Sequence, residues 1–255
     1  HILINTEKET IMVASLRNVN ARNVIIGPVI APPPSYDYFL DTFDGTSDLS
    51  AHTANTGESY YGDQAPSTLV ASGAFTVSGG NLLKEDDFSS NGYSVGVAVA
   101  NPPINDFFIE ITSTFNADVV PPGWPAGSGS GIYLLDDFFG AFQGCSLSLS
   151  YGFPYPSPSR YFISMWVNTP SNPGVTTQID PATYTPGDSY LLRINVTNAG
   201  QTVTWFFNNT QIGTTTSDFP FFEQYWLEQF ATFTPSTPLD VTISQWRTGP
   251  LPWTP

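Results

Sequence analysis

The sequence has few of the residues on which many catalytic and charged binding sites depend. Charged residues make up only 11% of the 255 positions, well below the roughly 25% of an average soluble domain. There are two histidines and a single cysteine, Cys145, so no disulfide can form within the chain. Cys145 lies in an alternating segment, which predicts a buried, unreactive thiol. No apolar run approaches the about 20 residues of a membrane-spanning helix, so we expect no membrane partner.

Positive charge is also scarce, and it is unevenly distributed. The formal net charge is −15. Residues 1–35 hold three basic and two acidic residues, a net charge of +1, whereas the rest of the chain holds four basic and twenty acidic residues, a net charge of −16. An acidic body repels the phosphates of DNA and RNA. We therefore expect no nucleic-acid partner.

What the chain does have is aromatic and β-forming sequence. Hydrophobic residues make up 40% and aromatic residues 15% of the chain, which is enough for a sizeable core. Apolar and polar residues alternate with a period of two in several runs, a pattern typical of antiparallel strands buried on one face. These runs are 107–115, 191–197, 202–207 and 239–244. We expect about ten to thirteen strands in a two-sheet antiparallel β-sandwich.

Two short segments predict tight hairpin turns between such runs. Asn208-Asn209 separates two strand-like runs, and asparagine tolerates the positive φ angles of a type I′ turn. Ser78-Gly-Gly-Asn81 predicts a second hairpin.

The first 35 residues differ from the rest. Runs 10–16 and 23–30 are β-like, but they contain too few apolar residues for a core of their own. Residues 31–35 form a proline-rich spacer, which favours an extended, stiff chain. We therefore divide the chain into an extended anchoring arm (1–35), a β-sandwich body (36–250) and a short tail (251–255). An apolar arm must bury its side chains either on the body of the same chain or on a partner. We predict that it contacts a partner through four apolar residues: Ile11, Val13, Val24 and Ile26.

Three stretches together give the body a family resemblance that covers roughly residues 38–247. Residues 41–57, with an HT…TG pattern at 52–57 and a following hairpin at 73–82, resemble the opening of lectin-like sandwich domains common in bacteriophage virion proteins. Residues 187–213 look like the laminin-G/concanavalin hairpin, with Asn208-Asn209 where Asp/Asn-Gly is commoner. Residues 239–244 look like the closing strand. The resemblance implies an all-β concanavalin/laminin-G-like jelly roll.

The same fold carries glycosidases, which resemble one another in having carboxylates at alternating positions of one strand, as in E-x-D-x-x-E. Glycosidic cleavage needs two carboxylates about 5–9 Å apart. Glu110 is alone on its strand-like run, and the acids at 85–87 and 136–137 are direct neighbours in sequence. No G-x-S-x-G motif accompanies the histidines, and His52 is predicted to be a hydrogen-bonded loop residue. We therefore predict no catalytic residue and a protein that is not an enzyme.

Binding sites are predicted at acidic and aromatic positions. Asp41 and Asp44 near the first strand are expected to approach Asp240 in the last, where carboxylates and carbonyls suit a structural Ca²⁺. The alternative is that all three are solvated turn residues. No other cofactor is predicted. Trp124, Tyr151 and Tyr155 are candidate glycan contacts, and the alternative is that they anchor loops against the sheet.

Segment 219–233 contains seven aromatic residues. Four of them recur near helical spacing, which predicts a short helix or wedge: Phe222, Trp226, Phe230 and Phe233. The first three are the candidate interface residues. The segment is expected either to plug one end of the sandwich or to form a subunit interface, where aromatic residues are enriched.

These observations predict a virion structural protein, either a capsid decoration (cement) protein or a fibre component on the particle surface. Its expected partners are capsid or tail proteins and copies of itself, by analogy in a homotrimer. The alternative prediction is a carbohydrate-binding module that attaches to host-surface glycans.

Overall fold

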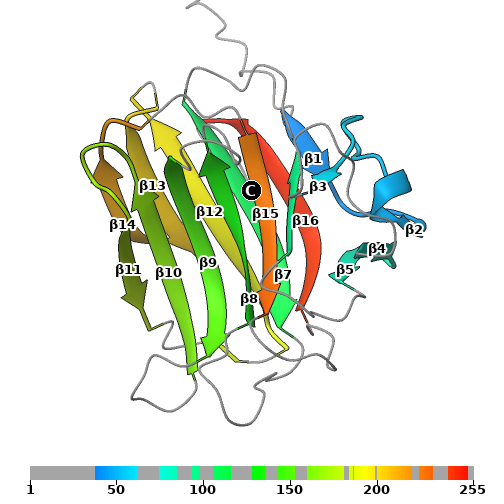
Figure 1. Cartoon of the computed structure of the whole chain (residues 1–255). Helices are drawn as coiled ribbons and strands as arrows, with labels where there is room; N and C mark the ends of the chain where they lie inside the picture. The colour runs from blue at the N-terminus through cyan, green and yellow to red at the C-terminus, as the bar shows by residue number, and fades with distance from the viewer. Residues whose placement is uncertain are drawn as a thin grey trace, which may run out of the picture. The chain divides into compact units, whose positions relative to one another are not determined.

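The computed structural model describes twelve stretches of the chain: residues 38–62, 75–84, 93–97, 106–115, 128–135, 143–152, 160–180, 184–185, 187–198, 200–219, 224–231 and 241–251. They form sixteen strands and one single-turn 3-10 helix, η1 (Leu49–Ala51) (Figure 1). The predicted arm, residues 1–35, and most of the predicted tail lie outside the described residues. No helix in the described part is long and apolar enough to span a bilayer.

Nine strands form the first sheet, in the order β14-β13-β12-β7-β16-β5-β4-β2, with β1 also paired to β16. Their bounds are β1 (Phe39–Asp41), β2 (Thr46–Asp48), β4 (Phe75–Ser78), β5 (Asn81–Lys84), β7 (Phe107–Phe115), β12 (Ser189–Thr197), β13 (Thr202–Phe207), β14 (Thr210–Thr216) and β16 (Val241–Pro250). The pairing of β1 with β16 joins the first described strand to the last.

Seven strands form the second sheet, in the order β11-β10-β9-β8-β15-β6-β3. Their bounds are β3 (Tyr61–Gly62), β6 (Tyr93–Val97), β8 (Ser128–Leu135), β9 (Gly144–Gly152), β10 (Arg160–Asn168), β11 (Val175–Ile179) and β15 (Gln224–Ala231). All pairings in both sheets are antiparallel. The predicted all-β, two-sheet sandwich is therefore confirmed.

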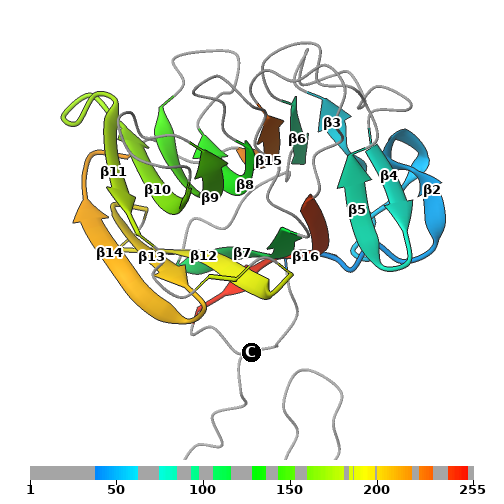
Figure 2. The same cartoon turned by 90° about the horizontal axis from the view of Figure 1, so that it is seen from below.

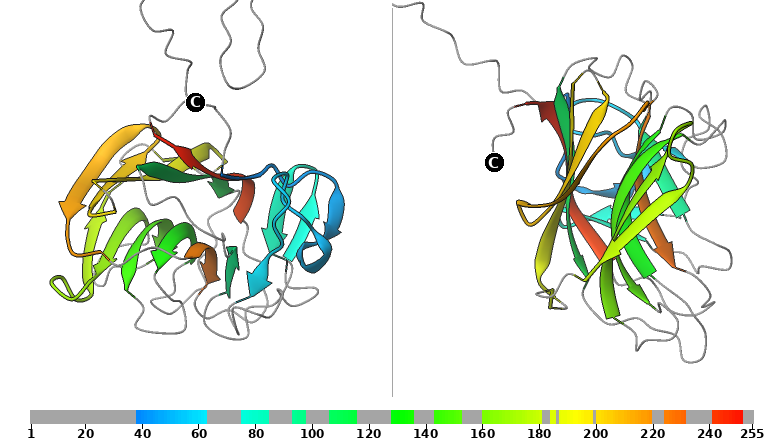
Figure 3. Two further views of the ribbon diagram at one scale, coloured as in Figure 1. Left: turned by 90° about the horizontal axis from the view of Figure 1, so that it is seen from above. Right: turned by 90° about the vertical axis from the view of Figure 1, so that its left-hand side faces the viewer.

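The two sheets are stacked face to face (Figure 2). At one side of the sandwich, β5, β4 and β2 continue the first sheet beyond β16 (Figure 3). The core lies between the sheets, and the predicted alternation accounts for it. Ile109 and Ile111 of β7, Leu192 and Ile194 of β12, and Val203 of β13 are all fully buried.

Both predicted hairpin turns are present. Asn208 and Asn209 adopt φ angles of 47° and 65° between β13 and β14, which is the left-handed region that a type I′ turn requires. Gly79 and Gly80 have φ angles of 60° and 75° between β4 and β5, and Ser78 pairs with Asn81.

The predicted helix in segment 219–233 is wrong, because residues 224–231 form strand β15. This strand lies inside the second sheet, paired with β8 on one side and with β6 on the other. Hydrogen-bonding partners on both sides stabilise an extended backbone, so tertiary pairing overrides the helical spacing of the aromatic residues.

The estimate of ten to thirteen strands was too low for a simple reason. Several of the sixteen strands are very short, with two or three residues in β1, β2 and β3. A strand of that length shows too little alternation to be recognised in a sequence.

Candidate functional site

The register of the second sheet aligns residues from separate strands into rows on its outward face. Tyr133 of β8 pairs with Ser146 of β9, and Ser146 pairs with Trp166 of β10. The neighbours of these residues along each strand, such as Ile132, Cys145 and Met165, are buried in the core. Because strand residues alternate between faces, the row Tyr133–Ser146–Trp166 lies on the side away from the core.

Within this row, two aromatic rings lie close together. The ring centroids of Tyr133 and Trp166 are 6.2 Å apart, and the rings are tilted by 49° to each other. The two residues belong to strands separated by β9, so the rings lean toward each other over Ser146, which is only 3% exposed. Both aromatic residues are themselves half-buried. We call Tyr133 and Trp166 the aromatic pair.

The next row along the sheet is made of small and polar residues. Gly131 pairs with Ser148, and Ser148 pairs with Ser164. A Cβ atom at Gly131 would lie 2.6 Å from the Cβ atom of Ser148, so only glycine fits where β8 and β9 approach so closely. The backbone register continues this row to Glu228 of β15, which is opposite Gly131. In the backbone register, Glu228 is therefore followed across the sheet by three small residues: Gly131, Ser148 and Ser164.

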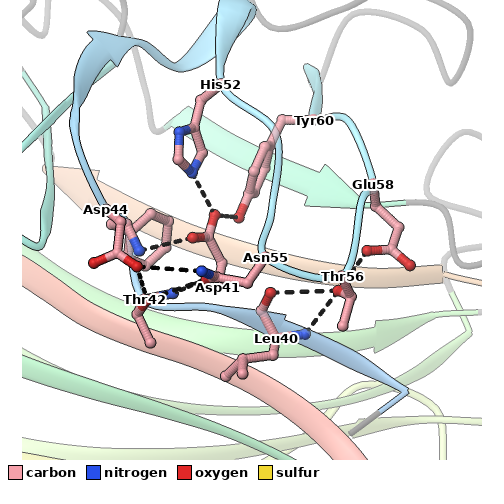
Figure 4. A network of polar contacts seen from close by, with 10 residues as sticks. Leu40, Asp41, Thr42, Asp44, His52, Asn55, Thr56, Glu58 and Tyr60 are labelled. Carbon is pink, nitrogen blue, oxygen red and sulfur yellow. Dashed lines mark hydrogen bonds and ion pairs between the residues drawn. The ribbon is translucent and has the colours of Figure 1, made fainter.

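A second polar cluster lies in the loop between β1 and β3, around Asp41 (Figure 4). Asp41 is fully buried, and one of its oxygens, Oδ1, accepts a hydrogen bond from the backbone N–H of Phe43 at 2.7 Å. The other oxygen, Oδ2, accepts one from the Tyr60 hydroxyl at 2.5 Å and lies 2.8 Å from His52 Nε2. The prediction that His52 is a hydrogen-bonded loop residue is therefore confirmed.

These contacts hold the loop in place. Burial, reinforced by the charge of Asp41, raises the pKa of Tyr60 well above its usual value, which keeps the hydroxyl protonated as a donor. Phe43 adopts a φ angle of 53°, which is uncommon for a bulky residue, and its ring is fully buried. The carboxylate of Asp41 is bonded to Phe43, Tyr60 and His52, so the cluster stabilises the fold of this loop.

Asp44 lies in the same polar network, but its hydrogen-bond partners differ from those of Asp41 (Figure 4). Asp44 is exposed, and its Oδ2 accepts hydrogen bonds from the Thr42 hydroxyl at 2.8 Å and from Asn55 Nδ2 at 3.2 Å. The bond from Thr42 is the main cause that lowers the pKa of Asp44, and the bond from Asn55 is the second. In the described part, no group of three or more His, Cys, Asp or Glu side chains is placed to hold a metal ion. Asp240 lies outside the described residues, and the calcium site stays a prediction.

Glu110, the carboxylate that the sequence singled out, is 2% exposed on the outward face of the first sheet. It forms an ion pair with Arg247, through Nε and Oε1, and its Oε2 lies 3.8 Å from Arg193 Nη1. The two guanidinium groups lie over Phe108 and Phe206. Burial lowers the pKa of Arg193, and the charge of Glu110 opposes that shift. Glu110 is thus part of a buried ion cluster that joins β7, β12 and β16.

The remaining predicted site residues fall in three groups. Ile11, Val13, Val24, Ile26, Trp124, Tyr155 and Phe222 lie outside the described residues. The backbone of Tyr151 belongs to β9, opposite Tyr161. Trp226 and Phe230 belong to β15, and Trp226 is opposite Tyr133. Their roles in glycan or partner contact stay predictions.

The aromatic pair was not predicted from the sequence. Tyr133 and Trp166 are 33 positions apart, and neither lies in a proline-rich loop like those of the predicted glycan contacts Trp124, Tyr151 and Tyr155. A weak signal existed in each segment. Tyr133 and Trp166 are each flanked on both sides by apolar residues, which would place them on the outward face of a buried strand.

Comparison with known proteins gives a match in fold. No protein-family model and no curated protein sequence matches the chain. Among solved structures, an endo-1,3-beta-glucanase from Streptomyces sioyaensis has a TM-score of 0.56 at 14% identity, covering 86% of this chain and 97% of that one. A Bacillus licheniformis beta-glucanase has a TM-score of 0.53 at 8% identity, covering 82% and 96%. The Emp47p carbohydrate recognition domain has a TM-score of 0.50 at 12% identity, covering 83% and 97%.

These similarities overturn one prediction. The chain was predicted not to be an enzyme because no strand carries the E-x-D-x-x-E pattern, and that prediction is wrong: glucanases are among the structures with this fold. The prediction considered only catalytic acids that lie within one strand. A sheet places residues of different strands side by side, so acids far apart in sequence can share one face.

Proposed function

We propose that this protein binds a neutral carbohydrate on the outward face of its second sheet. The observation that carries the proposal is the aromatic pair over Ser146, with ring centroids 6.2 Å apart. A pyranose ring has an apolar face of C–H groups that stacks on aromatic rings and a rim of hydroxyls that needs polar partners. Ser164 and Gln178 occupy the adjacent row, are at least partly exposed, and supply such partners.

The charge of the protein indicates the class of glycan. Residues 36–255 carry four basic and twenty acidic residues, so the body repels polyanions such as uronic-acid or sulfated polysaccharides. Neutral glucans carry no such penalty. β-1,3-Glucan is the first glycan to test, because an endo-1,3-beta-glucanase is among the proteins with a similar fold.

Binding to immobilised β-1,3-glucan and to a panel of neutral and acidic glycans tests the proposal. Trp166→Ala is expected to weaken binding by roughly tenfold, equivalent to about 1.4 kcal/mol. The matched control is Phe206→Ala, which removes an aromatic ring from the outward face of the opposite sheet. Equal affinities of wild type and Trp166→Ala for every bound glycan would contradict the proposal, and so would a lack of binding across the panel.

Glycoside hydrolysis is the second candidate, favoured by the register position of Glu228 opposite Gly131, in the row next to the aromatic pair. Cleavage is measured as new reducing ends after incubation with β-1,3-glucan. If hydrolysis occurs there, Glu228→Gln should abolish it and leave glucan binding intact. Full activity in Glu228→Gln would remove Glu228 from the reaction.

The finer role as a capsid decoration or fibre protein of a bacteriophage stays a prediction from the sequence resemblance. So do its partners in the particle and its place on the particle surface. Native mass spectrometry of the full chain tests the self-association part of that prediction. A closed homotrimer is the expected species, and a monomer at micromolar concentration would contradict it.

A further inference from the structure

We propose that β11 pairs edge to edge with β11 of a second copy of this chain. β11 ends the second sheet and, among the described residues, it pairs with β10 alone. The outer edge of such a strand presents backbone N–H and C=O groups that can pair with another strand. Four of the five residues of β11 are exposed, so the strand is accessible from solvent.

The strands at the other three ends of the two sheets carry features that prevent such pairing. β2 is three residues long and includes Asp48, and β3 is two residues long. β14 pairs with β13 in a register that shifts between Trp205 and Phe206. Short strands, charged side chains and bulges all protect a sheet edge. β11 contains no charged residue and no proline, and it pairs with β10 in a regular register over all five residues, so its edge lacks this protection.

The distribution of charge favours a contact between like copies on this side of the sandwich. Residues 36–255 carry four basic and twenty acidic residues, so two copies repel each other through their net charge. Residues 161–179, which include all of β11, contain no charged residue. Residues 194–217, which include β13 and β14 at the same side of the sandwich (Figure 2), contain none either. Two copies can therefore approach each other here with less repulsion than their net charge suggests.

The sequence of β11 is complementary to itself in the antiparallel direction. With Thr177 opposite the partner's Thr177, Val175 lies opposite the partner's Ile179, and Thr176 lies opposite the partner's Gln178. Val175 and Ile179 share one face of β11, whereas Thr176 and Gln178 share the other, so apolar residues meet apolar ones and polar residues meet polar ones. Val175 is 49% exposed, the one large hydrophobic residue of the described part with such exposure. This register covers it with an apolar side chain.

The contact is two-fold symmetric, because both copies use the same residues, and it joins two seven-stranded sheets into one continuous sheet. Asp180, which follows β11, lies opposite the partner's Gly174 in this register, so no acidic residue faces another. Five residue pairs bury less than the about 1,600 Å² of a standard interface. We therefore expect a weak contact, with a dissociation constant on the order of 0.1 mM or above. It adds to the predicted homotrimer and is too weak to be detected by native mass spectrometry at micromolar concentration.

Oxidative cross-linking of the full chain tests the pairing and its register. Thr177→Cys places a thiol on the two-fold axis, where directly opposite Cβ atoms are about 4.5–5.5 Å apart, which a small adjustment brings to the geometry of a disulfide. The native Cys145 is fully buried and does not compete.

Two controls measure cross-linking by random collision. Thr176→Cys moves the thiol off the axis, so the two sulfur atoms are no longer opposite each other, and Gln211→Cys places it at an exposed position of β14. We expect Thr177→Cys to form a covalent dimer, seen on a non-reducing gel, at least roughly tenfold faster than either control. Equal rates in all three variants, or no dimer of Thr177→Cys, would overturn the proposal.

Charged substitutions in the Thr177→Cys protein give a second measurement. Thr176→Glu with Gln178→Glu puts like charges opposite each other at both outward positions, which destabilises strand pairing, whereas Thr176→Lys with Gln178→Glu puts opposite charges there. Both positions are exposed, so these changes leave the core intact. Gln201→Glu with Gln211→Glu adds the same net charge at exposed positions away from β11.

The double-Glu protein on β11 is expected to lose the cross-link, and the Lys–Glu protein is expected to keep it. The protein with Glu at positions 201 and 211 should also keep it, because its added charge lies outside the contact. Cross-linking that is equal in the double-Glu and Lys–Glu proteins of β11 would show that β11 does not face its own copy, and it would overturn the proposal.

Discussion

At the scale of single residues, burial decides which polar groups are open to chemistry. Glu110 and Asp41 carry carboxylates, the groups expected in catalytic or metal-binding sites. Both residues are nevertheless at most 2% exposed and are bonded to neighbouring groups. Tyr133 and Trp166 have no such chemical signature, but both stay partly accessible on the sheet. Tyr133 and Trp166 are therefore candidate site residues because of where they lie on the sheet, and their residue types alone do not indicate a site.

Cys145 is expected to be unreactive in the folded protein. It is fully buried, and burial raises the pKa of its thiol, so almost no thiolate is present at neutral pH. A dithiobisnitrobenzoate assay should detect no thiol in the native protein and one thiol per chain in denaturant. Stoichiometric labelling of the native protein would contradict the burial of Cys145.

Asp218 should titrate well below an ordinary aspartate. A hydrogen bond from the Ser171 hydroxyl is the main cause that lowers the pKa of Asp218 to about 2, from 3.8. Because the folded pKa is the lower one, the stability that this bond contributes is complete above about pH 4 and is lost as the pH falls toward 2. Carboxyl ¹³C shifts measure the midpoint. Ser171→Ala should raise the pKa toward 3.8, whereas Ser171→Thr, which keeps a hydroxyl, should not.

At the scale of elements, the β1–β3 loop depends on a few buried contacts. The rings of Phe43 and Tyr60 are within 6.5 Å of each other, and Tyr60 also contacts Trp246 of β16 at 6.1 Å. Asp41 at the end of β1 connects this aromatic cluster to His52. One carboxylate thus connects three parts of the loop: Phe43, His52 and Tyr60.

Tyr60→Phe is therefore expected to destabilise the protein. It removes the hydroxyl that donates to Asp41 Oδ2, and a hydrogen bond to a charged group contributes about 1.5–3 kcal/mol. Urea unfolding should show a lower midpoint with an unchanged slope. Tyr38→Phe, which leaves the contacts of Asp41 intact, is the control. A wild-type midpoint in Tyr60→Phe would show that the hydroxyl contributes nothing to stability.

At the scale of the whole molecule, the stacked sheets separate two kinds of surface. The second sheet presents the aromatic pair on its outward face, whereas the outward face of the first sheet carries the Glu110 ion cluster. The edge between β11 and β14 adds a cavity that belongs to neither face. The proposed glycan face and the ion cluster therefore share one core but lie on opposite faces of the sandwich.

Deletion of residues 1–34 tests the predicted division of the chain. The described core is closed by the pairing of β1 with β16, so the truncated body is expected to stay soluble and rich in β structure by circular dichroism. If the arm is the anchor, the truncated protein should no longer assemble in native mass spectrometry. Unfolding of the truncated protein would instead make residues 1–34 part of the core.

The sequence by itself determined the local features of this protein. Alternation identified β7, β12, β13 and β16, and turn residues identified the hairpins at 78–81 and 208–209. These features depend on neighbours along the chain: side-chain direction repeats every two residues in a strand, and few residues tolerate positive φ. The fold class could be predicted because such local signals recur throughout the chain.

Only the tertiary structure decided which strands are neighbours and hence which residues meet. Segment 224–231 has aromatic residues at helical spacing, but two partner strands make it β15. The aromatic pair meets across β9, and Asp41 meets Tyr60 across a loop. Strand pairing depends on long-range contacts whose energy is distributed over the whole core, and no short stretch of sequence contains that information.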